Sequence, residues 1–183
     1  MADLIVENLI LSAQLQQTVD LKIIHSALPD SSFDPDQLPA VVLHFQDPSR
    51  VVFITAQGKM VCTGSKTEQD AIQALNETTD SLKEKELIKD STKITPQLES
   101  LVVSKKLDVA LPLASIKSKL PVDQYTYEPS TYPWLEYHEN GYSMLLFSSG
   151  NLVCTGKISF EESIAAFKKI EDTLTSIGCK VAE

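Results

Sequence analysis

The side chains that could perform acid–base or nucleophilic chemistry are few and widely spaced in this chain. The three histidines are His25, His44 and His138, and none has a serine, cysteine or acid at a spacing that suggests a catalytic triad. No metal-ligand cluster or phosphate loop is recognisable, because the motif-like glycines read as turn glycines. The sequence therefore argues against an enzyme, a cofactor and a bound metal.

The three cysteines fit a reducing, intracellular compartment. Cys62 and Cys154 occupy equivalent places in two similar segments, and Cys179 lies near the end of the chain. Equivalent positions of two lobes would normally be far apart, which argues against a disulfide between them. We expect Cys62 and Cys154 to be small buried strand residues.

Those two segments reveal an internal repeat. The stretch GKMVCTG (58–64) returns as GNLVCTG (150–156), 92 residues later. The flanking FDPDQLPAVVLHF (33–45) returns as YEPSTYPWLEYHE (127–139), 94 residues later, so a two-residue insertion must lie in a loop. A period this long predicts two pseudo-symmetric lobes, residues 1–90 and 91–183, and not a solenoid.

Composition bounds what these lobes can be. With 183 residues, 43% of them hydrophobic, the chain can bury one good core or two small fused ones. No apolar run approaches the ~20 residues of a membrane span, so no membrane partner is expected. The net charge of −9, with a single arginine, taken alone speaks against a nucleic-acid-binding surface.

Each repeat shows the same order of periodicities. A strand pattern (4–15, 98–109) is followed by a short helical pattern (20–28, 113–119). Three strand patterns then follow in each repeat, and Gly58 and Gly150 mark the hairpin turn between the last two. These strands are expected at 41–46, 51–56 and 59–63, and at 134–138, 142–148 and 151–155.

A long helix closes each repeat. In the second, Ser159 and Glu162 form a capping-box pattern and Gly178 is expected just past the helix end. Its predicted apolar face comprises Phe160, Ile164, Phe167, Ile170, Leu174 and Ile177. The first helix, at about 67–85, has a weaker stripe of Ala71, Ala74, Leu75, Thr78 and Leu82. Each helix must cover one sheet face and leave the other free.

The paired VCTG segments and the two proline elbows resemble the core domain of the TATA-box-binding protein family, over about residues 4–177. The resemblance implies an α+β fold of two pseudo-symmetric repeats forming a saddle, with a curved antiparallel sheet and two long helices on its convex side. It also implies a general transcription initiation factor that binds and bends the minor groove of TATA-like promoter DNA. The implied protein partners are transcription factor B and the RNA polymerase machinery.

The resemblance also implies which residues contact bases. Asn8 matches an asparagine that hydrogen-bonds base edges, whereas its partner position holds Ser100. An apolar and hydroxyl surface suits A·T pairs, which present only acceptors in the minor groove. The residues expected to form this surface are Ile10, Val61, Thr63, Val102, Val153 and Thr155.

Four wedge positions follow from the same resemblance. Members of the family insert phenylalanine side chains between base pairs. Phe147 matches one of these phenylalanines, and Tyr132 retains an aromatic ring at a second position. In the first repeat the corresponding residues are Leu38 and Thr55. Threonine is short and polar, so weaker kinking by the first repeat is expected.

Contacts to phosphates and to the protein partner are altered. Lys59 and Lys66 match phosphate-contacting lysines, whereas Asn151 and Ile158 stand at the equivalent places of the second repeat. His44 and His138 occupy sites where the family favours arginine; each is either a phosphate contact or a solvated strand-end side chain. The elbow residues implied for transcription factor B are Glu128, Ser130 and Thr131, of which the last two depart from the family.

These departures leave two functions open. The first is a TATA-binding transcription factor, found in the cytoplasm and nucleoid of an archaeon or in a nucleus. The second is a divergent paralogue that uses the fold as a protein-interaction module with weak or no TATA recognition. An uncovered apolar sheet face would also associate with a second copy, so a homodimer is a further expectation in the absence of DNA.

Overall fold

The computed structural model describes residues 4–121 and 123–179, which form two compact units. One unit is Asn8–Glu99, and the other joins residues 4–7 to residues 100–179. The unit boundaries therefore fall inside the first strand of each repeat. The repeat limits 1–90 and 91–183 were drawn from sequence similarity and stay a prediction.

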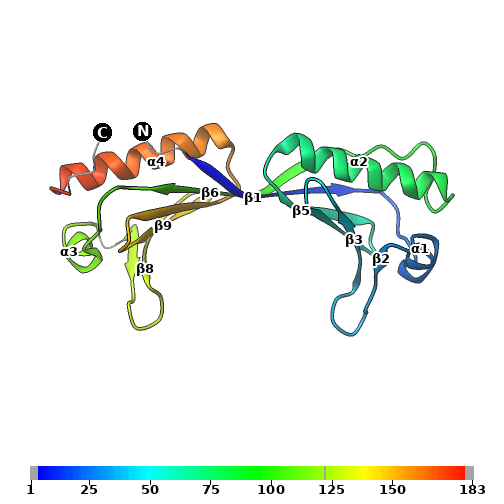
Figure 1. Cartoon of the computed structure of the whole chain (residues 1–183), viewed down its shortest axis with the longest axis horizontal. Helices are drawn as coiled ribbons and strands as arrows, with labels where there is room; N and C mark the ends of the chain where they lie inside the picture. The colour runs from blue at the N-terminus through cyan, green and yellow to red at the C-terminus, as the bar shows by residue number, and fades with distance from the viewer. Residues whose placement is uncertain (1–3, 122, 180–183) are drawn as a thin grey trace. The chain divides into compact units, whose positions relative to one another are not determined.

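In the first repeat a long strand is followed by a short helix, four shorter strands and a long helix (Figure 1). Its elements are β1 (Ile5–Gln14), α1 (Leu21–Ala27), β2 (Ser31–Ser32), β3 (Ala40–Phe45), β4 (Arg50–Thr55), β5 (Lys59–Ser65) and α2 (Glu68–Glu84). In the Asn8–Glu99 unit the strands lie in the order β2-β3-β4-β5-β1, and neighbours are antiparallel.

The second repeat has the same element order. Its elements are β6 (Gln97–Lys106), α3 (Leu113–Lys117), β7 (Tyr125–Tyr127), β8 (Trp134–Glu139), β9 (Tyr142–Phe147), β10 (Asn151–Gly156) and α4 (Phe160–Ser176). The strand order β6-β10-β9-β8-β7 is again antiparallel. The predicted α+β class, with two repeats of sheet and long helix, is thus confirmed. The short edge strands β2 and β7 were not predicted.

One long helix packs on one sheet face in each unit, α2 against β4 and β5, and α4 against β10 (Figure 1). Side chains alternate along the strands, so Met60 and Cys62 are buried under α2 while Val61 and Thr63 on the opposite face are only half-buried. The same alternation recurs in β10. Within the described residues, each sheet therefore has a face covered by its long helix and an opposite face of half-buried side chains, which we call the open face.

The predicted face of α4 needs correction. Phe160 and Ile164 are exposed, whereas Ser163 and Ala166 are buried. These small residues allow the helix to lie close to the sheet, which turns the packed face away from the two bulky side chains. The Ser163 hydroxyl donates to the Phe160 carbonyl at 2.6 Å, so the buried oxygen is satisfied.

The other helix predictions are confirmed. Every residue of the stripe expected on α2 is buried. In α4, Ser159 and Glu162 form the capping box, and Gly178 follows the helix at φ +89°. No helix in the described ranges is long and apolar enough to cross a membrane.

The two hairpin glycines hold positions that exclude a side chain. Gly58 and Gly150 have φ of +78° and +88°, and both donate the N–H that closes the turn. A Cβ at Gly58 would lie 2.1 Å from the carbonyl oxygen of Gln17, and one at Gly150 would lie 2.2 Å from that of Val109. The hairpins therefore require glycine for both conformation and space.

Candidate nucleic-acid interface

The open face of the Asn8–Glu99 unit collects the groove-floor residues that were expected in the first repeat. Val61 and Thr63 of β5 point to this face, and Val61 is the register partner of Ser12 on β1. Ile10 lies on the same side of β1 as Ser12, and it is half-buried. The surface combines methyl groups with hydroxyls, as a minor-groove contact to A·T pairs requires.

The unit of residues 4–7 and 100–179 presents the matching set. Val153 and Thr155 of β10 are half-buried and pair in register with Ser104 and Val102 of β6. Ser100 stands two residues before Val102 on the same side of β6 and is also half-buried. Each unit therefore carries a Val and Thr pair on its open face, opposite a buried cysteine.

Asn8 is held in place by its neighbours on β5. Its Nδ2 donates to the Thr63 hydroxyl oxygen at 3.1 Å, and its Oδ1 accepts the Gly64 N–H at 2.8 Å. Because a backbone N–H must donate, the second bond fixes which end of the amide faces which partner. The side chain is thereby presented in one orientation on the open face.

Two serine–carboxylate pairs were missed by the sequence reasoning. The Ser12 hydroxyl donates to Oε1 of Glu99 at 2.6 Å, and the Ser104 hydroxyl donates to Oε1 of Glu7 at 2.6 Å. Ser104 follows Ser12 by 92 residues and Glu99 follows Glu7 by 92 residues, which is the interval between the two VCTG segments. That spacing is the signal that could have revealed them. Each pair places a carboxylate on an open face.

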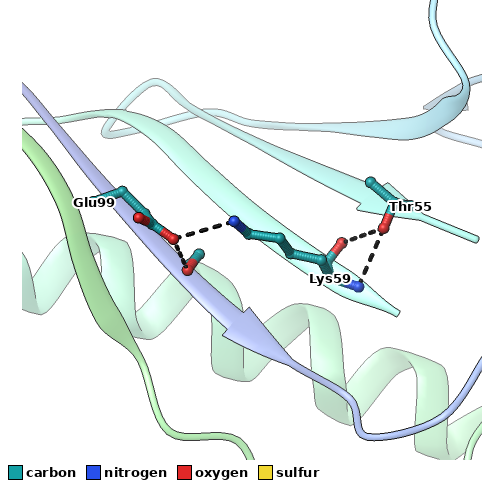
Figure 2. Close-up of polar contacts among 4 residues, drawn as sticks. Thr55, Lys59 and Glu99 are labelled. Atoms are coloured by element: carbon teal, nitrogen blue, oxygen red, sulfur yellow. Dashed lines mark hydrogen bonds and ion pairs between the residues drawn. The ribbon is translucent and has the colours of Figure 1, made fainter. Parts of the chain in front are cut away.

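Lys59 lies beside one of these carboxylates, as Figure 2 shows. Its Nζ is 3.1 Å from Oε1 of Glu99, with both side chains partly exposed. The Thr55 hydroxyl bonds the backbone N–H and carbonyl oxygen of Lys59 at 3.2 and 3.3 Å and so closes the hairpin turn. The expected phosphate contact is therefore engaged with an acid in this structure.

The equivalent place in the other unit is a hollow of about 580 Å³. Asn151 takes the position that Lys59 has in the first repeat, so the carboxylate of Glu7 has no equivalent lysine from β10. The hollow is lined by Ile5, Glu7, Ser104, Lys105, Lys106, Asn151 and Val153.

The four wedge positions are accessible to different degrees. Leu38 and Tyr132 are exposed, at 40% and 50%, in the turns that lead into β3 and β8. Thr55 and Phe147 are half-buried at the ends of β4 and β9, on the open face. Phe147 was expected on the open face. It follows Leu146 on β9, and because Leu146 is buried on the helix-covered side, the next side chain projects to the open face.

Positive charge is scarce near the expected phosphate contacts. The only arginine, Arg50, is buried: it donates to the Asp70 carbonyl at 2.8 Å and stacks on the Phe45 ring. Lys66 is exposed just before α2. Exposed His44 lies on β3, whereas Nδ1 of His138 is 3.5 Å from a carboxylate oxygen of Glu136.

The elbow residues Glu128, Ser130 and Thr131 gather in one exposed turn between β7 and β8. The Glu128 carbonyl accepts the N–H groups of Thr131 and Tyr132 at 2.8 and 2.9 Å. The turn is thereby fixed by its own backbone, and its side chains project from the end of the sheet. The structure brings these three predicted residues together.

Two histidines contact serines: His138 Nδ1 lies 3.3 Å from the Ser143 hydroxyl oxygen, and His25 contacts Ser31. Nδ1 of His25 lies 2.9 Å from the Ser31 hydroxyl oxygen, and that hydroxyl donates to the Leu28 carbonyl at 2.6 Å. The serine proton is thus committed to a backbone oxygen, and the histidine donates to the serine. This pair fastens α1 to β2 and does not activate a nucleophile.

The repeat cysteines are inert strand residues, as expected. Cys62 and Cys154 are buried free cysteines, and neither forms a disulfide. Burial raises the pKa of the Cys62 thiol, and it raises the pKa of Cys154 to about 12. Both thiols therefore stay protonated at neutral pH.

Comparison with known proteins gives one consistent result. The model of the family described as "Transcription factor TFIID (or TATA-binding protein, TBP)" matches residues 3–85 and again 95–177. The chain is 32% identical over 176 residues to the TATA-box-binding protein of Archaeoglobus fulgidus, covering 94% of this chain and 95% of that protein. It is 34% identical to TATA-box-binding protein B of Halobacterium salinarum, with 94% of each chain covered.

A solved structure extends the likeness to three dimensions. The TBP of Methanococcus jannaschii superposes with a TM-score of 0.80 at 28% sequence identity. The superposition covers 95% of this chain and 99% of that one. The similarity therefore extends over most of the chain and is not confined to one repeat.

Proposed function

Because the chain belongs to the TATA-binding protein family of transcription factors, we propose that it binds the minor groove of TATA-like promoter DNA through the open sheet face of each unit. It bends that DNA and recruits a transcription factor B-type protein and RNA polymerase. The family is one of transcription factors and not of enzymes, which agrees with the structural role of the His25–Ser31 contact. The protein works inside the cell, where promoter DNA is.

The observation that carries the proposal is the matched open face of the two units. Val61 with Thr63, and Val153 with Thr155, are half-buried opposite cysteines that the helices bury. A minor groove of A·T pairs offers only the acceptors N3 of adenine and O2 of thymine, while G·C adds an amino group. Methyl groups pack against such a floor, and hydroxyls supply donors to it. The surface thus favours A·T-rich sites.

Charge sets the expected strength of binding. Phosphate contact is made chiefly by lysine and arginine, and here Arg50 is buried and Lys59 is paired with Glu99. We expect weak binding in the absence of a partner. A transcription factor B-type protein that docks on the Glu128 turn and on DNA together would raise the affinity through linkage.

A direct test uses a labelled TATA duplex and a scrambled duplex of equal composition. Fluorescence anisotropy is measured over a range of salt concentrations, with and without a transcription factor B-type protein. The proposal predicts a preference for TATA that the partner strengthens. Replacement of Glu128 by glutamine should abolish the gain from the partner, while the preference for TATA over the scrambled duplex in the absence of the partner is retained.

The alternative function is a protein-interaction module. It is favoured by the carboxylates of Glu7, Glu99 and Glu136, which stand at or beside the open faces and oppose phosphate binding. Equal affinity for the TATA and scrambled duplexes, with the partner present, would contradict TATA recognition. Retention of the partner under those conditions would support the module.

A further inference from the structure

Three aromatic rings form a continuous row in the unit of residues 4–7 and 100–179. The ring centroids of Tyr132 and Trp134 are 4.8 Å apart with 31° between the planes. Those of Trp134 and Phe147 are 5.7 Å apart at 53°. Trp134 is therefore the central member of the row, in contact with both wedge residues. The family resemblance implies no role for Trp134.

The strand register places this row on the open face. Trp134 of β8 and Phe147 of β9 are direct partners across the antiparallel pair, so their side chains project to the same side. Their neighbours Leu135 and Leu146 are fully buried and project to the other side. Both rings nevertheless keep partial exposure, and Tyr132 is 50% exposed. The row is available to a ligand that covers the open face.

The first repeat has no such row at the equivalent places. Ala40 and Thr55 are register partners there, as Trp134 and Phe147 are in the second repeat. Leu38 precedes Ala40 as Tyr132 precedes Trp134. The Thr55 hydroxyl is also committed to the backbone of Lys59. The large apolar contact area therefore belongs to the second repeat alone.

We propose that Trp134 is itself a DNA-contacting residue that stacks on a base step opened by Phe147 and Tyr132. The proposal rests on the proposed function, since it concerns the same face and the same duplex. Aromatic side chains stack on any exposed base, and flexible pyrimidine–purine steps such as TA unstack most readily. The second repeat therefore makes the main distortion, and it selects the end of the site that holds such a step.

Trp134 also provides its own probe, because the chain has one tryptophan. A base stacked on an indole quenches its emission, and a tryptophan that only supports Phe147 from the side would keep its emission. The wild-type protein is titrated with a labelled TATA duplex, and tryptophan emission and the anisotropy of the label are read in the same samples. Quenching that saturates together with anisotropy is expected.

The outcomes separate this proposal from the proposed function. Rising anisotropy with unchanged tryptophan emission would overturn the role of Trp134 and leave DNA binding intact. An unchanged anisotropy would overturn both. Because wild-type protein is used, the result does not depend on the folding of a variant.

Variants give a second, quantitative test. Trp134→Ala copies the residue of the first repeat, and we expect about tenfold weaker binding and a smaller shortening of the end-to-end distance of the duplex. Trp134→Phe should retain most of both. Ile164→Ala changes an exposed apolar side chain on α4, away from the open face, and should bind as wild type. Wild-type affinity and bending in a folded Trp134→Ala would contradict the proposal.

Discussion

The ammonium group of Lys59 lies 3.1 Å from Oε1 of Glu99 on the open face of the Asn8–Glu99 unit. The same carboxylate oxygen accepts the Ser12 hydroxyl at 2.6 Å. A phosphate that approaches Lys59 must therefore compete with an acid that is already in position. Glu99 therefore competes with a DNA phosphate for the ammonium group of Lys59.

Glu99→Gln should strengthen binding to DNA. The substitution removes a negative charge and frees Lys59 for a phosphate, while an amide can still accept the Ser12 hydroxyl. We expect a several-fold higher affinity at low salt, and a slope of log affinity against log salt that is steeper by up to about 0.9. Salt-dependent anisotropy titrations measure both.

The matched control is Lys59→Gln in the Glu99→Gln background, which should cancel the steeper slope. If Glu99→Gln alone leaves affinity and slope unchanged, Lys59 does not contact phosphate.

Thr55→Phe should increase DNA bending by the first repeat. The new ring would lie where Phe147 lies in the second repeat, at the end of a strand on the open face. Loss of the hydroxyl bonds to Lys59 should lower the free energy of unfolding by about 1 kcal/mol. Energy transfer between dyes at the duplex ends reports bending. Thr55→Val, which loses the hydroxyl without adding a ring, should show the destabilisation without the gain, and an equal gain in Thr55→Val would refute the wedge explanation.

Gly150→Ala should strongly destabilise the hairpin between β9 and β10. The φ of +88° disfavours alanine, and its Cβ would lie 2.2 Å from the Val109 carbonyl oxygen. We expect a loss of about 3 kcal/mol or more, measured by denaturant unfolding. Gly178→Ala is the control, because it has φ +89° with no atom within 4 Å of the new Cβ, and it should cost about 1 kcal/mol. Equal costs for the two substitutions would show that close contact does not matter.

Glu139 should contribute to the acid sensitivity of the fold. Its Oε1 accepts from Nζ of Lys169 at 2.6 Å, and its other oxygen accepts the Tyr142 hydroxyl. The Lys169 contact, followed by the Tyr142 bond, lowers the pKa of Glu139. A depressed pKa means that the contribution is present above the unfolded value of about 4.3 and is lost as the pH falls through the lower folded value.

The test for Glu139 compares the unfolding of wild type and Glu139→Gln from neutral pH down to about pH 3. The difference in stability should shrink as the solution is acidified. Because both partners are substantially exposed, the effect is expected to be small. A difference that is constant over this range would remove Glu139 from the acid response.

The repeat carried most of what the sequence could predict. Gly58 and Gly150 located the hairpins, and Ser159 with Glu162 located the start of α4, because turns and caps are set by local conformation. The prediction of the packed face of α4 was wrong at Phe160 and Ile164, which are exposed. That face depends on how closely the helix approaches the sheet, which periodicity does not contain.

The candidate site residues were predicted from the family resemblance, and strand alternation explains where the structure places them. Val61 and Val153 lie on the open faces because each alternates with buried neighbours. The partners of Glu7 and Glu99 were missed, because each contact joins strands of different repeats that are far apart in sequence. The contact of Trp134 with Phe147 likewise depends on a register between β8 and β9 that the sequence leaves open.

The most direct measurement of the central claim compares three duplexes that differ only in the TATA-like element. One contains A·T pairs, one contains inosine·C pairs, which keep the minor-groove surface of A·T but present the major groove of G·C, and one contains G·C pairs. Reading by the Val and Thr surface of the open faces predicts similar affinity for the first two duplexes and much weaker binding to the third. Loss of binding with inosine·C, or equal binding to all three, would contradict minor-groove recognition of TATA-like DNA by this protein.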